Sequence, residues 1–286
     1  MPSTIDIRRR IRSVRNTQQI TKAMKMVAAA RLRRAQERIF AARPYAAALR
    51  EVLASVAARV DVEHHPLLEQ REEKKVLLLV ITADRGLCGA FNANAIKAAM
   101  NAMKDHREWE SVQLIPIGRK ANDFFKRRAI PIRRQATQIF QALSLDTARE
   151  IASTLIDDFT AGEVDAVYAV FNEYRSIISQ ITRLERLLPI ERAWDGEAAA
   201  VEYLYEPTPA EILNDLLPKH VEFQLYRMLL ESAAAEQGAR MTAMESATKN
   251  ATEMIAHLTL TYNRIRQAAI TKEIIEIVSG ASAQEA

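Results

Sequence analysis

The residues best placed for phosphate chemistry lie in the segment 82–92 (TADRGLCGAFN), which directly follows an apolar run. Gly86 and Gly89 stand between an expected strand and an expected helix, where a phosphate-binding loop would lie. The segment nevertheless lacks both the GxGxxG spacing and the Gly-Lys-Ser/Thr of a P-loop. We expect a tight turn that packs on the sheet, with nucleotide binding as the alternative.

The single cysteine and the histidines are the remaining candidates for catalysis or metal binding. Cys88 could act as a nucleophile only beside a histidine, and none of the five histidines lies in a recognisable partner motif. We expect a buried structural thiol, and one cysteine excludes an internal disulfide and a Cys-based zinc cluster. Glu63, His64 and His65 are adjacent and cannot all face one ion, so we expect a solvated loop there. The sequence thus predicts no catalytic, cofactor or metal site.

Much longer elements must position any functional surface, and the longest is the run 219–279. It holds no proline and one glycine, Gly238, and consists mostly of strong helix formers. As one helix it would be roughly 90 Å long. Its second half has a seam in steps of three and four: Met241, Met244, Thr248, Ala251, Ile255, Leu258, Tyr262, Ile265 and Ala269. This spacing is typical of coiled-coil a and d positions and requires a partner helix.

The expected partner is the N-terminal run 3–43, which holds neither proline nor glycine. Ser3 and Asp6 form a capping pair, Pro44 is expected to close the run, and residues 45–60 form an amphipathic continuation. The apolar residues follow helical spacing but drift from a strict heptad. They are Ile7, Ile11, Val14, Ile20, Met24, Val27, Leu32, Ala35 and Ile39.

The charge is distributed unevenly along the 286 residues, whose net charge is +4. Residues 1–43 hold twelve Lys/Arg against two Asp/Glu, whereas residues 221–286 hold six against eight. The two helices therefore attract each other weakly and leave a basic excess. No window holds eighteen consecutive apolar residues, and the N-terminus lacks the apolar block of a signal peptide. We expect a soluble cytoplasmic protein.

Between the two helices the pattern changes to alternating strands and helices. Residues 76–81 (VLLLVI) read as a strand buried on both faces of a parallel sheet. The expected elements that follow are a helix at 92–104, a strand at 112–117, a helix at 119–128, a short strand at 130–132, a helix at 146–159, and strands at 164–172, 177–188 and 201–205. In the expected strand at 177–188, apolar and polar residues alternate, as they do in an edge strand with one face in solvent. Such alternation predicts β-α-β units and a mostly parallel sheet.

The predicted architecture is α/β: a long antiparallel coiled coil of N- and C-terminal helices with an inserted Rossmann-like α/β domain. We expect the N-terminal coiled-coil helix at 1–60, the α/β foot domain at 61–209 and the C-terminal coiled-coil helix at 210–286. Three prolines, Pro207, Pro209 and Pro218, precede the long proline-free run 219–279.

Three segments carry a family likeness. Residues 7–36 (IRRRIRSVRNTQQITKAMKMVAAARLRRAQ), residues 82–92, and the tail from Ala239 (ARMTAMESATKN to YNRIRQAAITKEIIEIVSGA) closely resemble the gamma subunit of the rotary (F-type) ATP synthase. The resemblance implies a central-stalk shaft that turns inside a ring of three alpha and three beta subunits. It also implies a foot that binds the epsilon subunit above the membrane rotor ring of c subunits, peripheral to the cytoplasmic face of the bacterial inner membrane. The shaft would couple proton-driven rotation to the catalytic sites on the beta subunits.

The resemblance also assigns contact residues. Met24 and Lys25 match positions that face an acidic helix-turn-helix lever of a beta subunit, and Arg240 is similar to an arginine that meets an acidic group on it. Arg266 and Gln267 resemble a pair that engages a catch loop on beta. The other matches are Thr271 and Glu273 near the tip, and Tyr203, Tyr205 and Glu206 on the rotor ring. A plant-type insertion with two redox cysteines is absent, so no thiol switch of that kind is expected.

Two rival functions remain open from the residues themselves. A basic coiled coil could bind nucleic acid, although residues 1–39 contain no aromatic side chain for stacking on bases. A dehydrogenase-like enzyme could be built on the α/β unit, but no dinucleotide fingerprint is present. The family resemblance implies neither: it predicts a non-catalytic subunit with no cofactor, no nucleic-acid partner and no inserted membrane segment.

Overall fold

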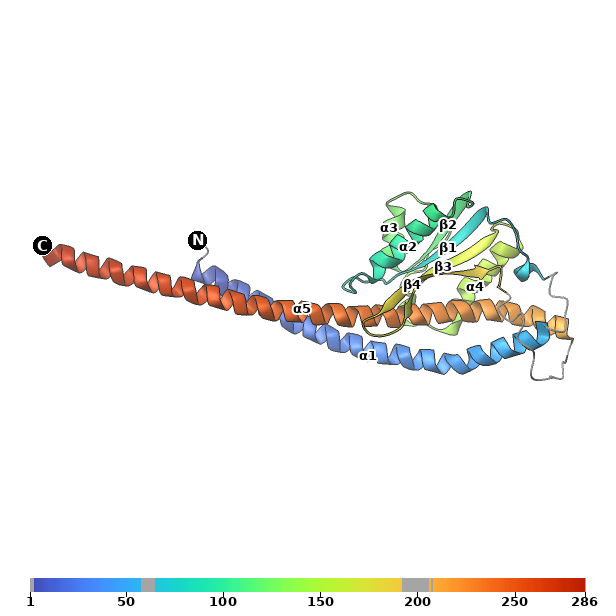
Figure 1. Ribbon diagram of the computed structural model, residues 1–286, viewed down its shortest axis with the longest axis horizontal. Helices are drawn as coiled ribbons and strands as arrows, with labels where there is room; N and C mark the ends of the chain where they lie inside the picture. Colours follow the sequence, from blue (N-terminus) through green and yellow to red (C-terminus); the bar gives the residue numbers. More distant parts are fainter. Residues whose placement is uncertain (1–2, 58–64, 192–205, 207, 286) are drawn as a thin grey trace. The chain divides into compact units, whose positions relative to one another are not determined.

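The computed structural model describes residues 3–57, 65–191, 206 and 208–285. The chain divides into two compact units, which are described one at a time. Residues 1–27 and 241–286 form one, and residues 28–240 form the other. Two long helices, α1 (Thr4–Ala57) and α5 (Pro209–Glu285), each contribute to both units (Figure 1).

Both long helices begin with the same capping box. The Asp6 backbone N–H donates to Ser3 Oγ at 3.2 Å, and the Ser3 N–H donates to the Asp6 carboxylate at 3.3 Å. The Ser3 hydrogen bonds lower the pKa of Asp6. Thr208 and Glu211 make the same reciprocal bonds at the start of α5, where Pro209 occupies a first-turn position that needs no N–H. The predicted capping role of Ser3 and Asp6 is confirmed.

The prolines do not end the helices as expected. α1 continues through Pro44 to Ala57. α5 begins at Pro209, within one residue of the expected helix at 210–286, and runs through Pro218, so it extends ten residues ahead of the proline-free run at 219. A proline inside a helix removes one backbone hydrogen bond, so packing on either side can hold the helix together. Here Tyr45, next to Pro44, packs on Phe223, with ring centroids 4.9 Å apart.

In the first unit, the N-terminal part of α1 and the C-terminal part of α5 form an antiparallel pair (Figure 1). Four cross-helix hydrogen bonds define the register: Arg8 to Tyr262 at 2.6 Å, Gln18 to Thr252 at 2.7 Å, Thr21 to Thr248 at 2.8 Å and Lys25 to Glu245 at 2.6 Å. The residue numbers of each pair add to 269 or 270. The predicted antiparallel coiled coil is therefore confirmed.

The seam of α5 lies where its spacing predicts, except that Ala269 is exposed. On α1 two expected seam residues, Ile20 and Val27, are 59% and 53% exposed. Thr21 is buried instead, and the half-buried Gln18 and Lys25 complete the heptad. These polar residues bond across the interface, so their burial leaves no unpaired group there. The drift inferred from the apolar residues alone was wrong for this reason.

Two methionines ten residues apart on α5 test this seam. Met244 is 4% exposed, whereas Met254 is 53% exposed. Replacing Met244 by alanine should therefore cost about 2 kcal/mol of stability, because it removes buried apolar area and leaves a cavity. Met254→Ala is the matched control and should cost less than about 0.5 kcal/mol. Thermal unfolding followed by circular dichroism measures both, and equal melting temperatures for the two variants would contradict the seam.

The second unit contains a four-stranded sheet of order β2-β1-β3-β4. The strands are β1 (Lys75–Ile81), β2 (Ser111–Ile117), β3 (Ala166–Tyr174) and β4 (Gln180–Leu188). β1 is parallel to β2 and β3, and β4 is an antiparallel edge, which confirms the predicted sheet. The expected strand at 130–132 is wrong, since Ile132 makes only an isolated bridge to Leu114. The expected strand at 201–205 lies outside the described residues.

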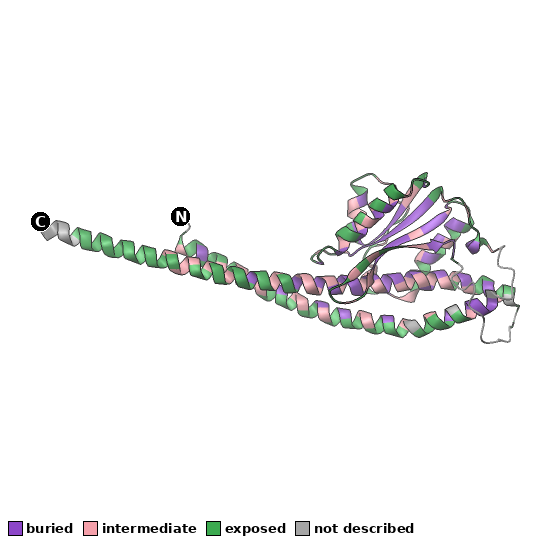
Figure 2. Ribbon diagram, in the orientation of Figure 1, coloured by how far each residue is buried: buried purple, intermediate pink, exposed green. Residues whose placement is uncertain are grey.

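Helices cover both faces of the sheet. α2 (Phe91–Asp105) and α3 (Arg119–Lys126) lie on one face, and α4 (Leu145–Thr160) and the first part of α5 lie on the other (Figure 1). Two short 3-10 helices complete the unit: η2 (Pro66–Leu68) and η3 (Ile139–Gln141). Figure 2 shows that β1 is buried along its length, with only Lys75 exposed. The carboxyl end of β1 leads into the segment 82–92, whose position the core therefore fixes.

Candidate functional site

The segment 82–92 is a rigid turn that packs on α5. Asn92 Oδ1 accepts a hydrogen bond from the Ala83 N–H at 2.9 Å, and its Nδ2 donates to Cys88 Sγ at 3.1 Å. Cys88 is buried in a cluster with Phe91 and Ala235 of α5. Burial raises the pKa of the Cys88 thiol, which keeps it protonated. The expectations of a packing turn and a buried structural thiol are confirmed.

Arg240 fastens this turn to α5. Its side chain is buried, forms an ion pair with Glu236 at 2.6 Å, and donates to the carbonyl oxygen of Gly86 at 3.2 Å. The family resemblance implies a beta-subunit contact for Arg240, whereas its pairing with Glu236 was not predicted. The i, i+4 spacing of the two residues was the available signal. In this structure the guanidinium already has an anionic partner within its own helix.

The remaining beta-contact candidates lie on the coiled coil and are more accessible. Met24 is half-buried, and the half-buried Lys25 pairs with Glu245. Farther along α5 the four candidates Arg266, Gln267, Thr271 and Glu273 are all exposed. Of the rotor-ring candidates, Glu206 is exposed, whereas Tyr203 and Tyr205 lie outside the described residues.

The end of α5 lies beyond the start of its partner helix. The register places Thr4, the first residue of α1, opposite about Arg266. Residues 267–280 are all exposed, which Figure 2 shows as a green stretch near the end of α5. Five large apolar side chains are included: Ile270, Ile274, Ile275, Ile277 and Val278. A helix end that exposes so many apolar residues is typical of a segment covered by another protein.

Comparison with known proteins gives the family. A family model described as ATP synthase matches residues 3–284. The chain is 54% identical to the ATP synthase gamma chain of Solibacter usitatus and 51% identical to that of Pelotomaculum thermopropionicum, with 100% of each chain covered in both comparisons. This chain belongs to the ATP synthase gamma chain family. It is accordingly a subunit of an ATP synthase and contributes to the central stalk.

Solved structures agree with the fold of this gamma chain. It is 25% identical to a chain of the central stalk and c-ring structure of Tetrahymena thermophila mitochondrial ATP synthase, with a TM-score of 0.61 over 80% of this chain and 99% of that one. A Euglena gracilis mitochondrial ATP synthase structure matches with a TM-score of 0.70 at 22% identity, over 98% of this chain and 94% of that chain. The second likeness shows the fold alone.

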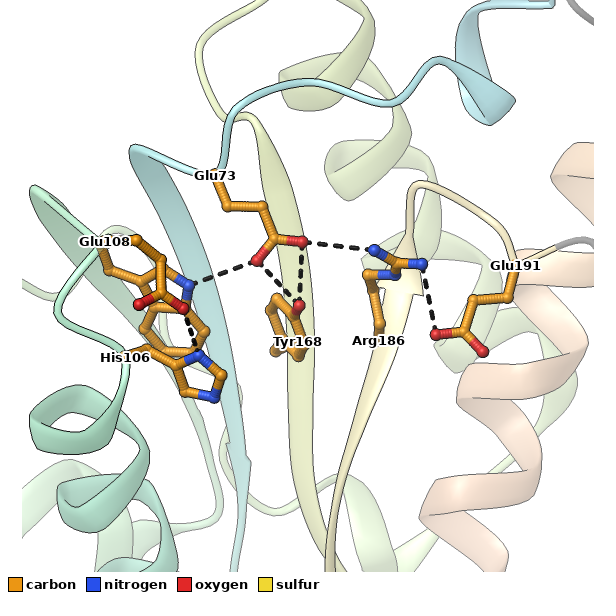
Figure 3. Close-up of polar contacts among 7 residues, drawn as sticks. Glu73, His106, Glu108, Tyr168, Arg186 and Glu191 are labelled. Carbon is orange, nitrogen blue, oxygen red and sulfur yellow. Dashed lines mark hydrogen bonds and ion pairs between the residues drawn. The ribbon is translucent and has the colours of Figure 1, made fainter.

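The gamma chain also carries a polar cluster at the amino ends of β1 and β3 (Figure 3). The Glu73 carboxylate accepts hydrogen bonds from the Tyr168 hydroxyl at 2.8 Å and Trp109 Nε1 at 3.3 Å, and it pairs with Arg186 at 3.3 Å. Arg186 also pairs with Glu191. Burial and then Glu73 raise the pKa of Tyr168, so its hydroxyl stays protonated and donates. The cluster joins β3 and β4 to the segments that precede β1 and β2, which is typical of a structural contact.

The described helices contain no segment that is both long enough and apolar enough to cross a bilayer. No group of three or more His, Cys, Asp or Glu side chains within the described parts of this gamma chain is arranged to hold a metal ion.

Proposed function

We propose that this gamma chain is the rotor shaft that couples rotation of the membrane ring to conformational change at catalytic sites on the beta subunits. Membership of the gamma chain family over residues 3–284 carries this proposal. The partners are the alpha and beta subunits, the epsilon subunit and the c subunits of the rotor ring. The setting is the cytoplasmic face of the bacterial inner membrane, with the gamma chain bound peripherally.

The geometry of the first unit supports a role in transmitting rotation. Its seam is continuous from Met241 to Ile265, and the four cross-helix hydrogen bonds fix the register of the two helices. A rod with a fixed register resists sliding of one helix along the other, so it can transmit a rotation. A partner shifts a conformational equilibrium only when it binds one conformation more tightly than another. An asymmetric rod makes different contacts with each of three equivalent sites, so it favours a different conformation at each.

The proposed contacts with beta follow the exposure of the side chains. Arg266, Gln267, Thr271 and Glu273 lie exposed on the part of α5 that α1 does not cover, where a catch loop can reach them. Met24 and Lys25 are half-buried at the seam and face the acidic lever. Arg240 forms an ion pair with Glu236. To contact an acidic group on the lever, Arg240 exchanges Glu236 for a carboxylate of the beta subunit.

The foot carries the other contacts in this proposal. Glu206 is exposed and, with Tyr203 and Tyr205, is assigned to the rotor ring. Catalysis is assigned to the beta subunits, and the gamma chain itself is proposed to hold no cofactor and to hydrolyse no ATP. The nucleic-acid alternative has no support in the comparisons, whose relatives are gamma chains along their full length.

Two arginines on the same exposed stretch of α5 test the coupling role. Membrane vesicles from cells whose own gamma chain is replaced by this one should pump protons when ATP is added. Arg266→Ala should lower the initial pumping rate roughly five- to tenfold, as expected for loss of a charge-assisted hydrogen bond to beta. Arg264→Ala is the matched control, because it removes another exposed guanidinium two residues away, on a different face of the helix.

The amounts of alpha and beta subunits bound to the vesicles distinguish impaired coupling from impaired assembly. Equal pumping by the Arg264 and Arg266 variants would contradict the assigned catch-loop contact. Vesicles that retain alpha and beta but never pump with the unmodified gamma chain would contradict the rotor role itself.

A further inference from the structure

A cleft in the second unit has a composition that the rotor role does not explain. Its volume is about 470 Å³, and four segments of the unit line it: α1, the loop after β1, residues 140–143 before α4, and α5. Phe140, Leu143 and Leu230 form the apolar part of its wall. Gln141 and Gln237 are its uncharged polar residues, and the remaining polar residues are charged. The size falls within the range of small-molecule sites.

Four arginines line this cleft. Arg31, Arg34 and Arg38 are three and four residues apart on α1, so they share one face of the helix in a row about 10 Å long. Arg85 reaches the cleft from the loop after β1. Within the described part of the chain, none of the four guanidinium groups makes an ion pair or a hydrogen bond. Like charges held this close repel one another unless an anion lies between them.

The two carboxylates in the cleft do not supply that anion. Asp84 Oδ1 accepts hydrogen bonds from the backbone N–H groups of Arg119 at 3.1 Å and Gln138 at 3.0 Å. Glu236 is neutralised by Arg240 at 2.6 Å. Both acidic groups are thus engaged in holding the loops and α5 in place. Because Arg240 neutralises Glu236, only the Asp84 carboxylate opposes the four guanidinium groups, and the cleft keeps an excess of three positive charges.

We propose that this cleft binds a polyphosphate anion. Guanidinium groups bind phosphate oxygens through paired, charge-assisted hydrogen bonds, and a row longer than one phosphate suits a chain of two or three. The phosphate chain could be inorganic or could belong to a nucleotide, whose nucleoside would pack on Phe140 and Leu143. This binding goes beyond the coupling function and does not rest on it.

An acidic protein segment is the rival ligand, and the cleft favours the polyphosphate. Each carboxylate carries a single charge at the end of its own side chain, whereas a triphosphate concentrates several charges in a volume that the cleft can enclose. Bidentate pairing with four guanidinium groups requires more acceptor oxygens than one or two carboxylates provide.

Calorimetric titration of the full-length chain with inorganic tripolyphosphate, and separately with ATP in metal-free buffer, tests the proposal. We expect one site for each ligand. The double variant Arg34→Ala, Arg38→Ala should weaken binding about a hundredfold, or about tenfold for each arginine. The control Arg12→Ala, Arg15→Ala removes the same charge from exposed positions on α1 outside the cleft and should change the affinity less than about twofold.

The two ligands identify the source of the phosphate. ATP that binds more tightly than tripolyphosphate indicates a nucleotide, and equal or weaker binding indicates an inorganic polyphosphate. An equal loss of affinity in the two double variants would overturn the proposal, because the anion would then bind to basic side chains anywhere on the surface. Tighter binding of a glutamate-rich peptide of the same total charge would also overturn it, in favour of an acidic protein partner. Circular dichroism of each variant checks that the substitutions leave the fold intact.

Discussion

Replacing Gly118 by alanine should prevent the α/β sheet from folding correctly. Gly118 joins β2 to α3 with φ of +92°, and a Cβ built there would lie 2.1 Å from the carbonyl oxygen of Thr82. Neither group can move easily, since Thr82 is buried at the end of β1. The combined clash and backbone strain should cost more than about 4 kcal/mol, which is a large part of the stability of a typical domain.

Gly162→Ala is the matched control for this prediction. Gly162 also has a positive φ, +72°, but a Cβ there would meet nothing within 4 Å. The Gly162→Ala substitution should therefore lower the free energy of unfolding only by the cost of a positive φ for alanine, about 1–2 kcal/mol. Denaturant unfolding followed by circular dichroism, together with soluble yield, measures both variants. A Gly118→Ala chain as stable as the Gly162→Ala chain would show that the close approach of Gly118 to Thr82 is not required.

Much of the fold followed from residue patterns because those patterns have one physical solution. The run VLLLVI becomes β1, whose residues from Val76 to Ile81 are at most 1% exposed, and only a strand covered on both faces explains such a run. The capping box at Ser3 and the seam around Met244 are equally local signals. Pro44 and Pro218 do not interrupt a helix as expected, because the cost of a proline in a helix depends on packing by residues distant in the sequence, such as Phe223.

The contact surfaces were only partly predictable. The family resemblance supplied positions such as Met24 and Arg266, but it gave no environment for them. The heptad of α1 was hidden because Gln18 and Thr21, both polar, occupy core positions that only their cross-helix partners make acceptable. The arginine cleft draws its residues from four separate segments of the sequence. No single-segment pattern can reveal such a site before the fold is known.

Replacing Arg240 by alanine should both destabilise the second unit and impair coupling. The substitution leaves Glu236, which is 7% exposed, without its cation, and it removes the hydrogen bond to the carbonyl of Gly86. Breaking a buried ion pair by removing one partner typically costs about 3–5 kcal/mol. Denaturant unfolding should report that loss, and ATP-driven proton pumping in membrane vesicles should fall with it. An unfolding transition equal to that of the unmodified chain would contradict the stabilising role of the Arg240–Glu236 ion pair.

The double variant Glu236→Gln, Arg240→Gln distinguishes the stabilising role of the Arg240–Glu236 ion pair from the proposed contact of Arg240 with the beta lever. Two neutral amides at i, i+4 leave no buried charge and can still hydrogen-bond, so most of the lost stability should return. The lever contact, however, requires a cation at Arg240, and a neutral amide cannot attract an acidic group over the same range. We therefore expect a stable gamma chain that assembles with alpha and beta but pumps protons several-fold more slowly at low salt. Normal pumping by this variant would leave Arg240 with the structural role alone.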